Sequence, residues 1–376
     1  MATPASVAAP VGQKRFATQD RLVALDAFRG ATMALMVLVN DPGDGRHVYA
    51  PLQHAEWNGW TPTDMVFPSF VWIVGVALTL SLARRLAAGV SRGVLFRQAF
   101  RRAVILYLLG LAVYAAPAFN PSTQRLLGVL QRIAICYLAA VAIYLTTKLR
   151  GQILWLIGLL AGYWILMAFA PVPGYGAGRL DVEGNLAHYV DRLLLGAHNY
   201  HSTKTWDPEG VVSTLPAIAT ALFGILCGQL LRMKKTLAER VARMLILGVI
   251  LIAAGEICNI WLPINKKLWT TSFSLFMAGM DFVILGAFLW LVDGLNHKKI
   301  VKPLVIMGLN PITIYMISEL LDEALGISGL HHTIYNAVFA PLASPINASL
   351  LWALAYTALM FLVAWVMYRR GWVVRV

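Results

Sequence analysis

Long runs without a charged side chain recur along this chain, and they restrict it to one class of fold. Asp, Glu, Lys and Arg are absent from residues 65–83, 103–124, 151–178 and 210–231. A helix needs about 20 apolar residues to cross the ~30 Å hydrocarbon core of a bilayer, and these runs have that length. Hydrophobic residues make up 59% of the chain, more apolar surface than a soluble protein can bury. We therefore expect an all-α, polytopic integral membrane helix bundle.

Ten membrane-spanning helices are predicted from the spacing of these runs. We place them near residues 22–43, 64–83, 103–118, 128–147, 151–171, 211–231, 244–262, 268–292, 303–324 and 348–368. The charge-free stretch from 324 to 368 is too long for one helix. We expect an interfacial or re-entrant helix at 330–342, and an eleventh span stays open as the alternative.

The distribution of Lys and Arg predicts the orientation of the bundle. With the N-terminus in the cytoplasm, 22 of the 31 Lys and Arg residues fall in inside segments and seven in outside segments. The remaining two, Arg29 and Arg132, fall within spans. Cytoplasmic segments of membrane proteins carry this excess, so both termini are predicted to be cytoplasmic. The same excess accounts for the net charge of +13, which argues against nucleic-acid binding.

The rest of the chain is predicted to form tails and outer loops. We assign a disordered cytoplasmic tail to 1–20, a transmembrane domain to 21–370 with outer loops at 44–63, 172–210 and 325–347, and a cytoplasmic tail to 371–376. Within the second loop, AHYVDRLLL at 187–195 predicts an amphipathic helix along the surface. The three cysteines lie in apolar runs, so neither a disulfide framework nor a thiolate metal cluster is indicated.

Six ionisable residues fall within the predicted spans, where a charge is costly and usually faces the bundle interior: Asp26, Arg29, Arg132, Glu256, Asp281 and Glu319. Asp26 and Arg29 are three residues apart on one helical face and can form a pair. Such a pair either ties helices together or binds an anion. Arg132 and Glu319 lie near outer span ends, where a link between them is as consistent with a structural role as with catalysis.

The outer loop between the first two spans has the densest set of reactive side chains: Asn40, Asp41, His47, His54, Glu56, Trp57, Asn58 and Asp64. Histidine accepts a proton near neutral pH, as acyl transfer to an amine requires. His54 is therefore the leading candidate for a catalytic base, with a solvated or packing role as the alternative. His198 with His201, and His331 with His332, lack a carboxylate or Cys at metal-ligand spacing, so no metal site is predicted.

The second outer loop ends on two carboxylates, Asp207 and Glu209, directly before a span. They are placed to cap the following helix through its unpaired N–H groups, or to bind the ammonium or hydroxyls of a substrate. Five tryptophans lie near outer span boundaries, where an aromatic belt accounts for most of them and one can stack on a sugar ring: Trp57, Trp60, Trp206, Trp261 and Trp269.

Ordered motifs from about residue 21 to 369 resemble the heparan-α-glucosaminide N-acetyltransferase family. Its members are membrane enzymes that pass an acetyl group from cytoplasmic acetyl-CoA to a glucosamine amine on the other side. The motifs are RLVALDAFRG, the loop from Asn40 through HAEWNG to DMVFPSF, GVLQRIAICY, PVPG, DRLLLG, DPEG, NKKLWTTSF and GLNPITIYMISE. The chain departs from the animal enzymes at Pro42, Asp44 and Ser318, which leaves the acceptor sugar open.

The resemblance implies an acetyl-CoA-dependent N-acyltransferase that acts on an amino sugar, without a metal. It implies that His54 acts as base or transient acyl acceptor, with Asn40 beside it. The residues expected to bind the acceptor are Trp57, Asn58, Asp64, Asp207, Glu209 and Glu319. The residues expected to contact acetyl-CoA are Asp26, Arg29, Gln131, Arg132 and Asn310. A homodimer in the bacterial cytoplasmic membrane is also implied.

Two other classes of protein stay open at this point. A permease for amino sugars would use the buried charges to line a transport pathway. A structural membrane subunit would use the same polar residues only for packing and for contacts with other proteins.

Overall fold

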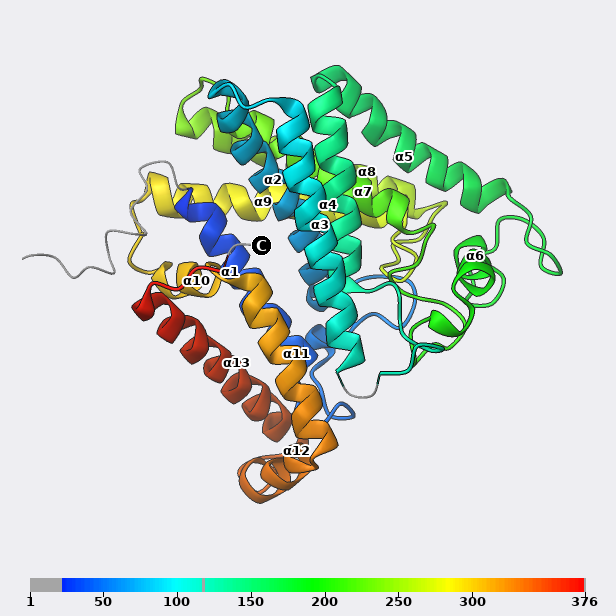
Figure 1. Ribbon diagram of the computed structural model, residues 1–376, viewed down its shortest axis with the longest axis vertical. Helices are drawn as coiled ribbons and strands as arrows, with labels where there is room; N and C mark the ends of the chain where they lie inside the picture. Colours follow the sequence, from blue (N-terminus) through cyan, green and yellow to red (C-terminus); the bar gives the residue numbers. More distant parts are fainter. Residues whose placement is uncertain (1–21, 117–118, 375–376) are drawn as a thin grey trace, which may run out of the picture.

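The computed structural model describes residues 22–116 and 119–374, and within these ranges the chain folds into helices joined by loops (Figure 1). The α-helices are α1 Val23–Asn40, α2 Val66–Ala87, α3 Arg92–Ala115, α4 Val129–Thr146, α5 Leu149–Phe169, α6 Leu186–Leu194, α7 Thr214–Leu231, α8 Leu237–Asn259, α9 Thr271–Leu289, α10 Lys302–Met307, α11 Pro311–Ile327, α12 Leu330–Ile334 and α13 Pro345–Arg370. The expected all-α class is therefore confirmed. The tail expected at 1–20 lies outside the described residues.

Nine of the described helices are long and apolar enough to cross a membrane. They are α1, α2 together with the 3-10 turn Pro62–Met65 that precedes it, α3, α4, α5, α7, α8, α9 together with the π-helical turn Trp290–Gly294, and α13. They match nine of the ten predicted spans, and the polytopic membrane character is confirmed. The helices expected at 187–195 and 330–342 are also present, as α6 and as α12 followed by the π-helical turn Tyr335–Phe339.

The tenth predicted span, 303–324, is interrupted in the structure. α10 ends at Met307 and α11 begins at Pro311, whose missing N–H suits the first position of a helix. At 17 residues, α11 is shorter than the predicted span. The interruption lets Gly308 pack against α1, since an added Cβ on Gly308 would lie 2.2 Å from the Asp26 carbonyl oxygen. The break therefore brings the backbone between α10 and α11 against the charged start of α1.

α7 forms the centre of the bundle and packs against α2, α4, α5 and α9. Its closest approach to α2 depends on two glycines. A Cβ added at Gly75 would lie 2.0 Å from the Ala221 carbonyl oxygen. A Cβ added at Gly224 would lie 2.0 Å from the Trp72 carbonyl oxygen. Small residues stabilise membrane helices in this way because close backbones gain dispersion contacts. α5 lies at the edge of the bundle (Figure 1), and α5 and α8 both expose large apolar side chains.

Loops on one side of the bundle make contacts with one another. We call this side the loop face and define it by residues 41–65, 119–128, 170–213 and 260–270. The Gly59 N–H donates to the Ile264 carbonyl at 2.8 Å. In Figure 1 the green loops around α6 and the blue loop before α2 meet beside the lower ends of α3 and α4. From this face, the 22 residues of α2 extend for roughly 33 Å to the opposite face.

Substitution of Gly224 tests the close packing of α2 and α7. We expect Gly224→Val to lower the melting temperature in detergent, because overpacking of this kind costs about 1–3 kcal/mol. Gly158→Val on α5 is the matched control, since an added Cβ there meets no atom within 4 Å. Equal melting temperatures for Gly224→Val and the parent protein would contradict the packing described here.

Candidate active site

A histidine–carboxylate pair lies where the loop face meets the start of α2. The side chain of Asp64 is 1% exposed, and its Oδ1 lies 2.7 Å from His54 Nδ1. Asp64 Oδ2 accepts hydrogen bonds from the backbone N–H groups of Thr61, at 3.0 Å, and Ala55, at 3.1 Å. Because an ionised carboxylate only accepts, Nδ1 carries the proton and Nε2 keeps its lone pair. This is the arrangement of a general base held by a carboxylate.

The sequence explains how this pair is built. Thr61 and Asp64 form a capping box at the 3-10 turn that leads into α2, and Pro62 occupies the first position of that turn. The loop before the turn leaves the His54 side chain 49% exposed. Asp64 is therefore fixed by backbone contacts on one side, while the imidazole it holds remains accessible to a substrate.

Lys266 is the third member of this group and is not among the site residues predicted from the sequence. Its Nζ lies 3.1 Å from His54 Nδ1, 3.4 Å from His54 Nε2 and 3.6 Å from Asp64 Oδ1. Burial lowers the pKa of Lys266, and the negative charges of Asp64 and Glu209 act against that decrease. The NKKLWTTSF motif contains this lysine, but nothing in the motif itself indicates contact with a histidine 212 residues away.

Asn58 and Trp57, both predicted to bind a substrate, hold loops together in the structure. Asn58 Oδ1 accepts from Asn265 Nδ2 at 3.2 Å, which joins the loop before α2 to the loop before α9. Trp57 Nε1 donates to the Leu180 carbonyl at 2.9 Å. The ring of Trp57 also packs edge-on against Trp206, with centroids 6.1 Å apart.

The aromatic belt expected near the outer span ends is wrong for two of the five tryptophans. Trp206 is 7% exposed and Trp269 is 1% exposed, so both belong to the protein interior. Trp269 lies under the guanidinium of Arg132, 5.1 Å from ring centroid to Cζ. These rings support buried polar groups instead of facing lipid headgroups.

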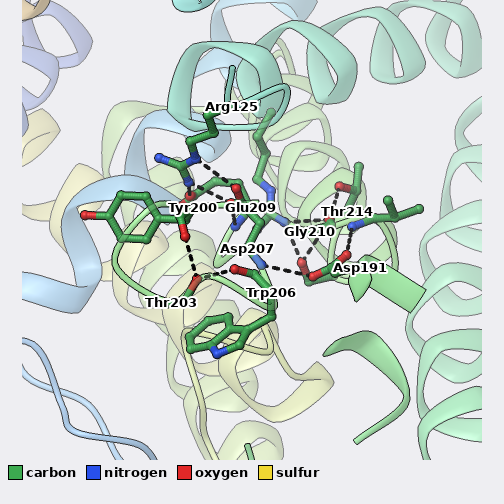
Figure 2. A network of polar contacts seen from close by, with 12 residues as sticks. Arg125, Asp191, Tyr200, Thr203, Trp206, Asp207, Glu209, Gly210 and Thr214 are labelled. Carbon is green, nitrogen blue, oxygen red and sulfur yellow. Dashed lines mark hydrogen bonds and ion pairs between the residues drawn. The ribbon is translucent and has the colours of Figure 1, made fainter. Parts of the chain in front are cut away.

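A second charged cluster surrounds Arg125, in the loop between α3 and α4 (Figure 2). The guanidinium donates to both carboxylate oxygens of Asp207, at 2.8 and 2.7 Å, and to Glu209 at 2.5 Å. The rings of Tyr114 and Tyr200 lie against it, 4.8 and 4.4 Å from centroid to Cζ. The capping role expected for Asp207 and Glu209 is wrong, because α7 begins after Ser213 without a side-chain cap.

Burial and charge oppose each other within this cluster. Burial raises the pKa of Asp207, and the Arg125 charge only partly offsets that increase. Burial also acts to raise the pKa of Glu209. The positive charges of Arg125, Arg132 and Lys266 outweigh burial, so the pKa of Glu209 is lowered. The effect of Lys266 on Glu209 also means that the two charged groups of the loop face act on one another.

Asn40, the last residue of α1, contacts Glu319 in the middle of α11, where Asn40 Nδ2 donates to Glu319 Oε1 at 3.4 Å. The charge of Glu319 also interacts with that of Arg125. Next to Asn40, burial and the negative charges of Asp322 and Glu319 raise the pKa of Asp41 to about 8. Asn40 is exposed, and its amide lies beside the Glu319 carboxylate; we call these two residues the polar site.

A cavity of about 800 Å³ extends into the bundle between α1, α2, α3, α4 and α11. Four arginines and a glutamine line one part of it: Arg29, Arg85, Arg101, Arg102 and Gln98. Met36 and Tyr315 also line it, and each stands four residues before a residue of the Asn40–Glu319 pair, Asn40 and Glu319 respectively. Four residues are roughly 6 Å of helix, so the cavity comes within about one helical turn of the polar site.

The residues predicted to contact acetyl-CoA are not all in one place. Arg29 and Asn310 line the cavity, and Asp26 forms the expected pair with Arg29 at 3.1 Å. Arg132 instead donates to the Gly210 carbonyl at 3.0 Å and to Ser213. Gln131 is buried behind Gly110, away from the cavity lining. The structure thus separates Arg132 and Gln131 from the cavity.

Two further ionisable residues differ in their surroundings. Asp281 is fully buried and accepts from Ser69 Oγ at 2.6 Å, as expected for a charge in the bundle interior. The same expectation is wrong for Glu256, which lies on the exposed side of α8 beside Asn259. Among residues 22–116 and 119–374, no three His, Cys, Asp or Glu side chains lie close enough to hold a metal ion.

Together, the helices, the histidine–carboxylate pair and the cavity with its arginines define a polytopic membrane protein with a site suited to base catalysis. Residues 21–255 match the family described as heparan-alpha-glucosaminide N-acetyltransferase, catalytic, and the chain belongs to that family. It is 30% identical over 369 residues to the heparan-alpha-glucosaminide N-acetyltransferase of Homo sapiens, and 29% identical over 365 residues to that of Mus musculus.

These two alignments cover 84% and 83% of this chain and 55% of each relative. The chain therefore spans about half the length of the curated relatives it matches. The family resemblance drawn from the ordered motifs is confirmed.

Substitution of Arg125 tests the buried charge cluster. Because the net effect lowers the pKa of Glu209, its carboxylate contributes stability above the pKa of unfolded glutamate, and that contribution is lost as pH falls through the folded value. We expect Arg125→Met to cost about 3–5 kcal/mol near neutral pH and less in acid, where the carboxylates take up protons. Thermal melting in detergent across a pH series measures this difference.

Arg179→Met is the matched control, because Arg179 pairs with Asp181 on the surface, where the two side chains are 51% and 44% exposed. We expect little change in its melting temperature. A loss in Arg125→Met that is equally large in acid would contradict the assigned role of the cluster.

Proposed function

We propose that this protein is an acetyl-CoA-dependent N-acyltransferase that moves an acetyl group onto the amine of an amino sugar of the glucosamine type. The observation that carries the proposal is the cavity, which is lined by a cluster of arginines and comes within about one helical turn of Asn40 and Glu319. Family membership supports the same reaction, since the relatives of Homo sapiens and Mus musculus are named N-acetyltransferases. Acetyl-CoA serves as co-substrate, and no metal takes part.

The arginines of the cavity suit the phosphates of CoA. Arginine binds phosphate through a planar fork of N–H donors, and several of them together neutralise a polyanion. We assign this contact to Arg29, Arg85, Arg101 and Arg102, with Asn310 at the same cavity. The apolar remainder of the cavity, including Met36 and Phe70, accommodates the pantetheine arm.

His54 is proposed to act on the amine at the loop face. Its Nε2 removes a proton from the amine as the nitrogen attacks the thioester carbonyl, the C–N bond forms and the C–S bond breaks. The proton then passes from His54 to the departing thiolate. Asn40 donates to the oxyanion that develops on the carbonyl. In the covalent route, Nε2 attacks first and holds the acetyl group until the amine arrives.

The residues expected to bind the acceptor divide into three roles. Glu319, beside Asn40, is the carboxylate we assign to the amine of the sugar. Asp64 orients His54, while Asp207 and Glu209 act through Arg125. Trp57 and Asn58 hold the loops that shape the site.

The orientation of the bundle follows from the same proposal. The cavity arginines lie on the side predicted to be cytoplasmic, where acetyl-CoA is made, and the loop face lies outside. We propose a bacterial cytoplasmic membrane location with both ends of the chain inside. The homodimer implied by the resemblance stays a prediction.

Two substitutions separate transfer from binding. We expect His54→Ala to lower acetyl transfer at least ~100-fold while acetyl-CoA binding stays at the parent value, because a general base contributes about 10²–10⁴-fold. We expect Arg102→Met to weaken acetyl-CoA binding about tenfold, the loss of one charge-assisted contact. Arg92→Met, on the same helix but outside the cavity lining, is the matched control and should leave binding unchanged.

Saturable binding of labelled acetyl-CoA and turnover with glucosamine measure these effects. Absence of acetyl-CoA binding to the folded protein would overturn the proposal. An amino-sugar permease would instead move labelled sugar into vesicles without acetyl-CoA and would tolerate His54→Ala. Label retained on the protein after incubation with acetyl-CoA alone would identify the covalent route.

A further inference from the structure

We propose that Lys266 is a positioning residue whose positive charge keeps His54 uncharged between turnovers and favours release of the proton that His54 takes up during each turnover. The inference rests on the proposed acetyl transfer and adds a residue to it. Lys266 Nζ lies 3.1 Å from His54 Nδ1 and 3.4 Å from Nε2, so the ammonium stands beside the imidazole ring itself. A positive charge at this distance disfavours a second positive charge on the ring.

The local fold holds Lys266 in place. Asn265, the preceding residue, is 1% exposed, and its Oδ1 accepts from the Leu268 N–H at 2.9 Å. The Lys266 carbonyl accepts from the Trp269 N–H at 3.0 Å, and Trp269 has a positive φ of 51°. These hydrogen bonds fix the backbone from which the Lys266 side chain, 20% exposed, extends to His54.

Three other charged residues act on His54 or Lys266 or lie next to them in the sequence: Asp64, Glu209 and Lys267. Asp64 is the acceptor on Nδ1, and it balances the charge of Lys266 at 3.6 Å. Glu209 acts on Lys266 from the neighbouring cluster. Lys267 points elsewhere, since its Nζ donates to the Glu56 carbonyl at 2.5 Å. Lys266 is therefore the cation in contact with His54 among the described residues.

This arrangement serves both halves of the proton transfer. A base must be uncharged when the amine arrives, and the ammonium of Lys266 favours that state. Once His54 Nε2 has taken the proton from the amine, two positive charges lie about 3 Å apart, and their repulsion favours release of the proton to the thiolate. The proton removed from nitrogen is thus the one that ends on sulfur, and Lys266 keeps its own proton throughout.

The test is the protonation of His54, measured without turnover. Diethyl pyrocarbonate reacts with the uncharged form of imidazole and not with the protonated form, so the rate at which His54 itself is labelled, located by mass spectrometry over a pH series, gives a midpoint. We expect Lys266→Met to move this midpoint upward by about one pH unit or more, since a full charge is removed at close range. The acid side of the kcat/KM profile should move in the same direction.

Two variants serve as controls. Lys266→Arg keeps the charge and should restore the parent midpoint. Lys267→Met removes the same charge one residue away and should shift the midpoint far less. If Lys266→Met does not fold, Lys266→Gln replaces it, with the same expected direction.

An unchanged midpoint in Lys266→Met, or an equal shift in Lys267→Met, would overturn the inference. This outcome is distinct from failure of the proposed function. If the midpoint shifts as expected but the parent protein transfers no acetyl group, the assignment of Lys266 to His54 stands and the acyltransferase proposal fails.

Discussion

The hydrocarbon core of a bilayer offers no hydrogen-bonding partner, so polar groups at its edge must be satisfied by the protein. Asp64 meets this constraint at the start of α2. Its 1% exposed carboxylate accepts from the backbone of Thr61 and Ala55 and holds His54 at 2.7 Å. One carboxylate thereby fixes the first turn before the helix, the loop that precedes it and the orientation of the imidazole. The remainder of the site is arranged around that ring.

Much of the fold follows from local sequence, whereas the site depends on contacts between distant segments. Charge-free runs locate nine helices because apolar length is a property of each segment alone. Asp64 is only ten residues from His54, so both fall in one loop that sequence could select. Lys266 is 212 residues from His54, and Arg125 is 82 from Asp207. No periodicity encodes such pairings, because each joins loops that lie far apart in the sequence. From the sequence we also predicted that Arg132 contacts acetyl-CoA. In the structure its hydrogen-bond acceptors are Gly210 and Ser213.

In the proposed reaction, the two reactants come from opposite sides of the bundle. α1 and α11 both line the cavity, and each carries a cavity residue one turn before a residue of the Asn40–Glu319 pair. The interruption between α10 and α11 brings Gly308 against α1 beside the Asp26–Arg29 pair. A continuous helix at 303–324 would lack this close contact. The same break places Asn310 on the cavity lining, where its amide bonds to the backbone of Trp372 at 3.0 Å.

Transfer across a sealed membrane tests the central claim most directly. The purified protein would be reconstituted in vesicles with labelled acetyl-CoA on the side of Arg101 and Arg102 and glucosamine on the side of His54. The account predicts labelled N-acetylglucosamine in the glucosamine compartment, and none when His54 is replaced by Ala. Product that forms only when both reactants share one compartment would contradict a catalytic site reached through the cavity.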